Sequence, residues 1–152
     1  MVKTTEKATV RLAAEASCPS HSRADVRVRD IAFAIDEPLA RGGTNAGPTP
    51  TDTALAALIG CTNVIAHKCA SRRALDIGHL AISATCEFDR RGVTLAEPVD
   101  VPFRSIELTV RADGAATQAE LDELAAEVAG FCPLATLFRQ AGTVIEEHWH
   151  AR

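Results

Sequence analysis

The sequence lacks the charge pattern of a protein that binds nucleic acid or an acidic membrane surface. Its formal net charge is −4 and its pI is about 5.7, whereas those partners require a concentrated excess of lysine and arginine. No uninterrupted apolar run approaches the roughly 18 residues that span a bilayer, and the first ten residues lack the apolar core of a secretory signal. We therefore expect a cytoplasmic protein with no nucleic-acid or membrane partner.

Sequence motifs of several enzyme classes are also missing. There is no Gly-x-Ser-x-Gly, no phosphate-binding glycine loop, no dinucleotide fingerprint and no internal repeat. A scaffold held together by disulfides has an even number of cysteines, whereas this chain has five, and none forms a C-x-x-C pair. Histidines and cysteines show no tetrahedral ligand spacing, so we expect neither a metal nor a bound cofactor. The length of 152 residues predicts one domain, 1–152, with residues 1–8 as a flexible N-terminus.

The most distinctive stretch that is present runs from Gly47 to Cys69. Gly47, Pro48 and Pro50 interrupt any preceding element, and Thr51 or Asp52 then stands where a helix N-cap is expected. Apolar residues recur at helical spacing with almost no charge between them, which predicts a helix buried on all sides: Leu55, Leu58, Ile59, Val64, Ile65 and Ala66. One sheet covers only one face of a helix, so a second subunit is expected to cover the other.

The remaining chain predicts strands and shorter helices around this central helix. Alternation and turn residues predict strands at 9–16, 26–35, 80–88, 106–110 and 144–149, the first two forming a hairpin about a turn at 18–22. A capping box at Thr117–Glu120 opens one further helix, and Cys132-Pro133 opens another that ends at Gly142. The predicted order is β-β-α-β-β-α-α-β, an α+β fold.

Two cysteines differ in setting from the other three. Cys61 lies in the middle of the apolar helix, where it is either a packing residue or a shielded reactive thiol. Cys132 is expected at a helix N-terminus, where free N–H groups and the helix dipole would lower its pKa. Cys69 lies two turns, about 12 Å, beyond Cys61 and is too far for a disulfide. Cys86 is expected to pack on a strand, and Cys18 to lie exposed in a turn.

The segment Gly42–Thr62, GGTNAGPTPTDTALAALIGCT, resembles the loop and central helix of the OsmC/Ohr superfamily. Phe131-Cys132-Pro133 followed by Leu137 resembles the helix that carries the second cysteine of that family, and residues 142–146 resemble its last strand. The resemblance covers roughly residues 25–150. It implies a β-sheet wrapped around a long central buried helix, an intertwined homodimer, and thiol-dependent reduction of hydroperoxides.

The resemblance also implies roles for individual residues. Cys61 would be the peroxidatic cysteine and Cys132 the resolving one, the two forming a disulfide that an external dithiol, of lipoyl type, reduces. In the family an arginine from the N-terminal hairpin activates the first cysteine. Arg23 is the candidate, and the alternatives Arg11, Arg27 and Arg29 stay open at this point.

Asp52 matches the position of an acidic residue that is usually glutamate in the family, and a plain N-cap is an equally good interpretation. Nine residues are two and a half helical turns, so Asp52 and Cys61 of one chain point to opposite faces. A shared site would therefore need Asp52 from the partner chain or from non-helical backbone that folds back.

The sequence thus favours a homodimeric reductase of organic hydroperoxides that acts in oxidative-stress defence. The alternative is a non-catalytic protein that binds a hydrophobic small molecule in an apolar pocket around Cys61. A third hypothesis, a purely structural dimer module, requires both cysteines to be inert. A cation near Cys61 would favour the first hypothesis over the second.

Overall fold

The computed structural model describes residues 8–152, which form two compact units that divide after Thr53. Of the flexible segment expected at residues 1–8, all but Ala8 lies outside the described residues. The single domain expected from the chain length stays a prediction.

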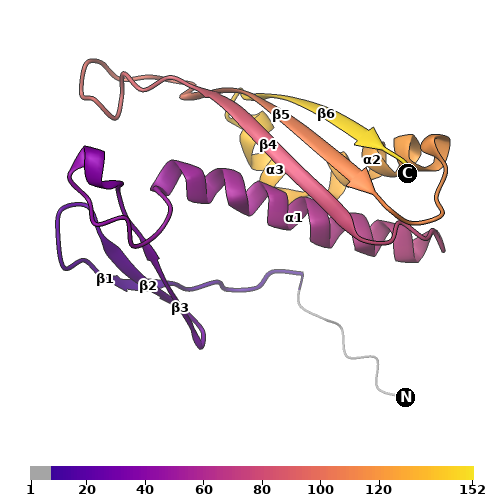
Figure 1. The fold of residues 1–152 in the computed structure, drawn as a ribbon, viewed down its shortest axis with the longest axis horizontal. Helices are drawn as coiled ribbons and strands as arrows, with labels where there is room; N and C mark the ends of the chain where they lie inside the picture. The colour runs from indigo at the N-terminus through magenta and orange to yellow at the C-terminus, as the bar shows by residue number, and fades with distance from the viewer. Residues whose placement is uncertain (1–7) are drawn as a thin grey trace. The chain divides into compact units, whose positions relative to one another are not determined.

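The first unit contains an antiparallel sheet of three short strands in the order β1-β2-β3 (Figure 1). The strands are β1 (Glu15–Ser17), β2 (Ala24–Val28) and β3 (Ile31–Ile35). A short 3-10 helix, η1 (Leu39–Arg41), follows in the loop that leads to the long helix α1 (Pro50–Arg72).

The continuous strand expected at 26–35 is wrong, because a two-residue turn divides it. Val28 pairs with Ile31, so Arg29 and Asp30 form the whole connection. Arg29 has a φ of 56°, in the left-handed region that glycine or asparagine normally occupies in such turns. Arginine gives no sequence signal for this conformation, so the turn was missed. The first strand also begins later than expected, at Glu15.

The first unit has almost no apolar interior. Among its described residues only Asp36, Gly43 and Thr49 are buried, whereas Ile31 and Phe33 are 50% and 42% exposed. A three-stranded sheet needs a covered apolar face for stability of its own. This sheet therefore depends on another surface.

One buried carboxylate organises the loop between β3 and α1. Asp36 accepts hydrogen bonds from the backbone N–H groups of Glu37 (2.8 Å), Thr44 (3.0 Å) and Ala46 (3.1 Å) and from the Thr44 hydroxyl (2.5 Å). Its own N–H donates to the Pro48 carbonyl at 3.0 Å. The Thr44 hydroxyl, followed by the backbone donors, holds the pKa of Asp36 well below its usual range.

The second unit is a three-stranded sheet with helices on one face (Figure 1). Its strands are β4 (Leu80–Phe88), β5 (Phe103–Ala112) and β6 (Val144–His150), with β4 and β5 antiparallel and β5 and β6 parallel. The crossover from β5 to β6 consists of α2 (Gln118–Phe131) and α3 (Pro133–Gln140). Helices and sheet share one core, which includes Leu58, Ala66, Ile106, Leu108, Val110, Leu121, Leu124 and Val128.

This part of the chain confirms most of the predicted elements and the mixed α+β class. The inner residues of β4 alternate with exposed ones, as its sequence predicts. The Thr117 hydroxyl accepts from the Glu120 N–H (3.3 Å), and the Glu120 carboxylate accepts from the Thr117 N–H (2.8 Å), so the predicted capping box is present.

The sheet covers only one face of α1, as expected, and the second subunit expected on the other face stays a prediction. Within one chain its buried residues form a stripe, Leu58, Thr62, Ala66, Cys69 and Ala70, whereas Val64 is 50% exposed.

The helix α1 is also long and apolar enough to cross a membrane by length and composition, as the core helix of a soluble protein can be. The sequence contains no uninterrupted apolar run of this length, but scattered polar residues do not prevent a high mean hydropathy.

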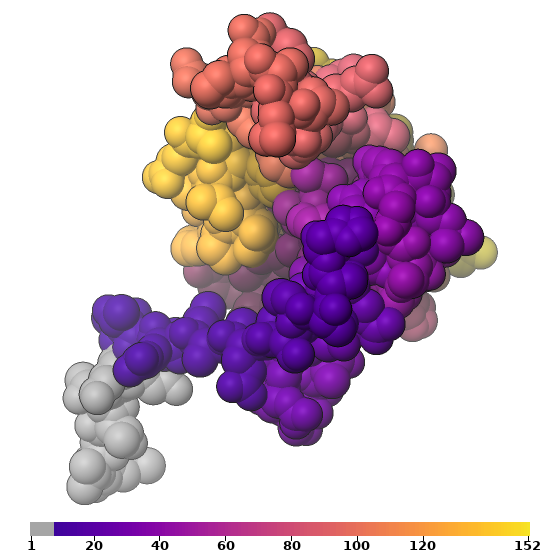
Figure 2. Space-filling view, turned by 90° about the vertical axis from the view of Figure 1, so that its left-hand side faces the viewer, coloured from indigo at the N-terminus to yellow at the C-terminus, as the bar shows by residue number. Residues whose placement is uncertain are grey.

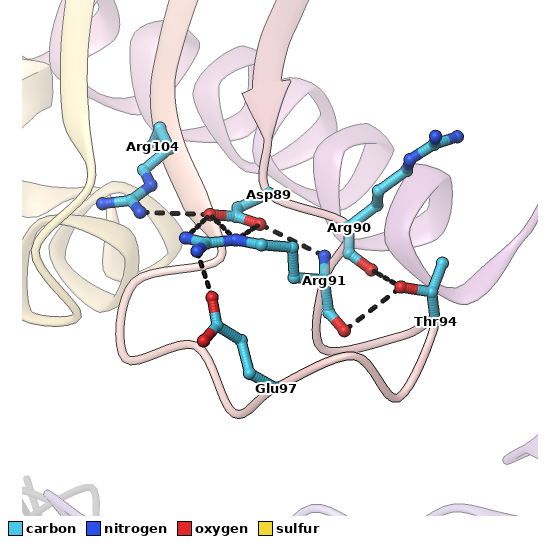
Figure 3. A network of polar contacts seen from close by, with 6 residues as sticks. All are labelled: Asp89, Arg90, Arg91, Thr94, Glu97 and Arg104. Carbon is cyan, nitrogen blue, oxygen red and sulfur yellow. Dashed lines mark hydrogen bonds and ion pairs between the residues drawn. The ribbon is translucent and has the colours of Figure 1, made fainter.

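An ion-pair network orders the loop between β4 and β5 (Figure 3). Asp89 accepts from Arg91 Nη2 at 2.6 Å and from Arg104 Nη2 at 3.1 Å, and Arg91 also pairs with Glu97. The hydrogen bonds from Arg91 hold the pKa of Asp89 well below its usual range. The loop lies at the surface, at the top of Figure 2, and Leu95 within it is 91% exposed.

The Asp89→Asn substitution is expected to make the melting temperature depend less on pH in the acid range. Because the folded-state pKa of Asp89 is lowered, its contribution is present above the unfolded value of about 3.9 and is lost as pH falls below it. The variant should have a lower melting temperature than the wild type at pH 6, and the two melting temperatures should converge toward pH 2. Asp100→Asn, at an exposed position of the same loop, is the control. Parallel profiles for wild type and Asp89→Asn would show that the network contributes no pH-dependent stability.

Candidate functional site

Cys132 is fixed by two helices at once. Its N–H donates to the Val128 carbonyl at 2.9 Å and ends α2, while its sulfur accepts from the Ala135 N–H at 3.4 Å and caps α3. Pro133 occupies the first position of α3, where its missing N–H costs nothing. The residue is 1% exposed. The sequence therefore predicted its position at the start of a helix correctly.

Cys61 lies beside Cys132 within the second unit. It is a half-buried residue of α1 that packs against the core. Its thiol neighbours the Cys132 thiol and raises the pKa of that group. Both are free thiols. The structure thus brings together the two cysteines that the sequence singled out, and their catalytic roles stay predictions.

The expected low pKa of Cys132 is wrong. Burial is the largest influence and raises the pKa of the thiol, because a thiolate loses its hydration there. The Ala135 N–H stabilises the thiolate as the helix N-terminus predicts, but its effect is smaller than that of burial, and neighbouring Cys61 raises the pKa further. The sequence revealed the helix terminus but not the burial of the sulfur.

Asp52 belongs to a capping arrangement at the start of α1. The N-cap expected at Thr51 or Asp52 is instead Thr49, whose hydroxyl accepts from the Asp52 N–H at 3.1 Å. Asp52 Oδ2 accepts in return from the Thr49 hydroxyl (2.7 Å) and N–H (3.4 Å). The helix begins at Pro50, so its N-cap is the preceding residue, Thr49. Asp52 acts as the acidic member of a capping box.

Arg23 lies in the first unit, directly before β2, and its Nε donates to Asp25 Oδ1 at 2.7 Å. It lines an open hollow of about 610 Å³ on the sheet, together with Glu15, Ala16, Ser17, Asp25, Val26, Arg27, Ala32, Phe33 and Ala34. The alternatives Arg11, Arg27 and Arg29 are exposed. The choice among these arginines stays a prediction.

The other cysteines have different surroundings. Cys18 is exposed, Cys86 is half-buried, and Cys69 is buried. Burial raises the pKa of Cys86 and of Cys69, and the Glu127 carboxylate raises that of Cys69 further. Within residues 8–152, no cluster of three histidine, cysteine or acidic residues is placed to hold a metal ion.

Sequence reasoning missed a half-buried carboxylate on β6. Glu147 faces the helices and pairs with Arg139 of α3 at 3.4 Å. Burial raises its pKa, against the opposing effect of Arg139. The alternation of Ile145, Glu147 and Trp149 along the strand was the signal that could have placed it on the inner face.

An apolar hollow of about 250 Å³ lies beside α3. It is lined by Ala54, Val101, Pro102, Phe103, Leu134, Leu137, Phe138, Ala141 and Thr143. Thr143 is 5% exposed, and its hydroxyl has no hydrogen-bond partner among the described residues. Neither Cys61 nor Cys132 is among its lining residues.

These features define a small α+β protein that carries two neighbouring free thiols, one in a long helix and one at the start of a short helix. Residues 43–148 match the model of the OsmC-like protein family. The chain therefore belongs to the OsmC-like family. A comparison with curated proteins gives no match.

Solved structures share this fold. The chain is similar to an OsmC-like protein from Mycoplasma pneumoniae, with a TM-score of 0.78 and 18% identity over 93% of this chain and 97% of that one. It is also similar to an organic hydroperoxide resistance protein from Elizabethkingia anophelis (TM-score 0.72, 15% identity, 97% and 100% covered). A third is the organic hydroperoxide resistance protein OhrB of Bacillus subtilis (TM-score 0.64, 16% identity, 93% and 98% covered).

Removal of the Cys61 side chain is expected to lower the pKa of Cys132. The Cys61→Ala substitution deletes a neighbour that raises this pKa, but burial, the larger cause, remains. The Cys132 pKa should therefore fall and still exceed its ordinary value. The measurement is thiolate absorbance against pH, with Cys132→Ser to identify the Cys132 contribution and Cys86→Ala as the control. A Cys132 pKa that is below the ordinary value in the wild type would contradict this account.

Proposed function

We propose that this protein reduces organic hydroperoxides at Cys61, with Cys132 as the resolving thiol. The observation that carries the proposal is the contact between these two free thiols in the second unit. Membership of the OsmC-like family supports it. The names of the Elizabethkingia and Bacillus proteins, which refer to organic hydroperoxide resistance, support it further.

In the first step the Cys61 thiolate attacks one oxygen of the hydroperoxide O–O bond. That bond breaks, the second oxygen leaves with a proton as an alcohol, and Cys61 becomes a sulfenic acid. In the second step the Cys132 sulfur attacks the Cys61 sulfur, a disulfide forms, and water leaves with the Cys132 proton. An external dithiol then reduces the disulfide and is itself oxidised to a disulfide.

The burial of Cys132 has a chemical consequence in this scheme. A thiol with a raised pKa is mostly protonated at neutral pH and reacts slowly with peroxide itself. The contact with Cys61 compensates by holding the two sulfurs together, so that a small thiolate fraction is sufficient for the second step. Cys61 is therefore the sulfur that meets the peroxide.

We further propose that Arg23 supplies the positive charge that activates Cys61 and that Asp52 holds this arginine. Arg23 already binds Asp25, so Asp52 would compete with that neighbour. We also propose that the protein acts in the cytoplasm without a bound cofactor and that its reductant is a dithiol of lipoyl type.

Substitution of the two cysteines should give different defects. Cys61→Ser should lower kcat/KM for an alkyl hydroperoxide by about a thousandfold or more, because serine is not ionised at neutral pH. Cys132→Ser should retain the first turnover, after which Cys61 proceeds to sulfinic acid since nothing captures the sulfenic acid. The measurements are dithiol-dependent peroxide consumption and peptide mass mapping.

Two further variants complete this experiment. Cys86→Ser is the control and should retain activity, whereas Arg23→Met should lower kcat/KM at least roughly tenfold if its charge stabilises the reacting thiolate. A mapped disulfide between Cys61 and Cys18 would exclude the proposed pair. Full activity of Cys61→Ser would exclude the mechanism.

A dimer is proposed on two observations. The sheet of the first unit has no buried apolar residue among those described, and α1 leaves Val64 half-exposed. An intertwined homodimer would cover both surfaces. Sedimentation at micromolar concentration should give twice the chain mass of 16.1 kDa.

Val64→Lys should shift the dimer toward monomer, because a charge would then be buried at the interface. Leu95→Lys, at an exposed apolar position in the β4–β5 loop, should not. A wild-type chain that sediments as a monomer would remove the support for the intertwined fold.

The second candidate function is non-catalytic binding of a hydrophobic small molecule. The apolar hollow beside α3 favours it, because its lining offers one unpaired hydroxyl and otherwise apolar side chains. A non-catalytic binding protein would bind apolar molecules equally well before and after the Cys61→Ser substitution, and it would not consume peroxide. The turnover assay above therefore distinguishes the two functions.

A further inference from the structure

Cys132 lies at the corner where α2 ends and α3 begins, and Pro133 leaves one carbonyl of this corner without its usual donor. In a continuous helix the N–H of residue 133 would donate to the Ala129 carbonyl, but proline has no N–H. Arg139, near the end of α3, supplies a donor instead, because its Nη1 lies 3.3 Å from the Ala129 oxygen. The last turn of α2 contains no basic residue of its own, so Arg139 also provides the positive charge that a helix C-terminus favours.

The same guanidinium reaches the sheet. Arg139 Nη2 lies 3.4 Å from Glu147 Oε2, on the inner face of β6. The Glu147 side chain is 15% exposed, so this contact is largely shielded from water. One side chain of α3 therefore links the last turn of α2 to β6.

The ion pair does not offset the burial of Glu147. Burial is the largest influence on this carboxyl and raises its pKa, and the opposing effects of Arg139 and Trp149 are smaller. A carboxyl whose pKa is raised in the folded state lowers stability while it is ionised, above that pKa, and this loss fades as pH falls through it. The pair therefore fixes a geometry without stabilising the fold at neutral pH, as ionisable groups at functional sites do.

From this arrangement we infer that Arg139 and Glu147 are positioning residues, which hold the Cys132 sulfur where it reaches the Cys61 sulfur. The N–H of Cys132 belongs to the end of α2, and its sulfur caps α3. A change in the angle between the two helices therefore moves this sulfur relative to Cys61 on α1. The inference rests on the proposed function, because a resolving thiol has to meet Cys61 in a defined geometry.

The test is the equilibrium between the reduced wild-type chain and a glutathione redox buffer, which needs no peroxide. Glutathione disulfide oxidises the two thiols, the Cys61–Cys132 bond forms, and two molecules of reduced glutathione are released with the two thiol protons. The ratio of disulfide to dithiol at known glutathione concentrations gives the effective molarity of the pair, which rises with how well the sulfurs are held together. Peptide mapping of the acid-quenched chain assigns the bond.

Variants of the pair should lower this effective molarity. Arg139→Met removes both contacts of the guanidinium and should lower it roughly tenfold. Arg139→Lys should recover part of the loss, because one ammonium group does not reproduce the fork that serves two acceptors. Glu147→Gln should also lower the effective molarity, yet it should not lower the melting temperature at pH 7, since it removes the buried charge. The double variant should be no worse than Arg139→Met alone, because the two side chains act as a unit.

Arg104→Met is the matched control. It removes an arginine that pairs with a carboxylate, that of Asp89, at 3.1 Å in the same unit. This pair links β5 to the β4–β5 loop rather than α2 to β6. The effective molarity of the control should equal that of the wild type.

A wild-type effective molarity in folded Arg139→Met and Glu147→Gln would overturn the inference, and so would a wild type that forms no Cys61–Cys132 disulfide in the buffer. A fall that follows the melting temperature in every variant, Arg104→Met included, would overturn it as well, because the pair would then have a structural role alone.

The two proposals fail separately. A lower effective molarity in variants of a chain that consumes no peroxide would support the positioning role while the proposed function failed. Peroxide turnover in which Arg139→Met captures the Cys61 sulfenic acid as fast as the wild type would support the function and exclude the positioning role.

Discussion

The sheet of the second unit covers one stripe of α1, and the candidate site depends on this one-sided burial. Leu58 and Ala66 are fully buried, and the buried Thr62 hydroxyl between them is satisfied by the Leu58 carbonyl at 2.9 Å. Cys61 stands at the edge of that stripe, half in the core and half accessible. A thiol in the middle of the stripe would be sealed from solvent, whereas one on the opposite face would not reach α3 and Cys132.

Local sequence signals predicted the elements of the second unit well. The capping box at Thr117–Glu120, the proline after Cys132 and the alternation in β4 each act within a few residues, so the sequence alone reveals them. The loop that Asp36 organises could not be predicted in this way, because its donors lie up to ten residues away and include backbone groups. The turn at Arg29 was missed because the pairing of β2 with β3, rather than residue type, sets its left-handed backbone.

The candidate site shows the same division. The position of Cys132 follows from its neighbours in the sequence, but its ionisation follows from burial, which no local pattern reveals. The approach of Cys61 to Cys132 joins residues 71 positions apart, as their numbers show, and only the family resemblance suggested it beforehand. Arg23 and Asp52 are engaged by their own neighbours, Asp25 and Thr49, and such local pairs say nothing about a more distant role.

The polar character of the first unit has a consequence for its dynamics. Its strands are held by backbone hydrogen bonds with no buried apolar side chain among the described residues to oppose their opening. In an isolated chain the amide hydrogens of β2 and β3 would therefore exchange rapidly with solvent, while those of β5, in the core, would be retained until global unfolding. Slow exchange in β2 and β3 would measure the free energy with which another surface holds this sheet. The protein would thus have two separate free energies of opening. One is set by the core of the second unit, and the other by the surface that covers the sheet of the first unit.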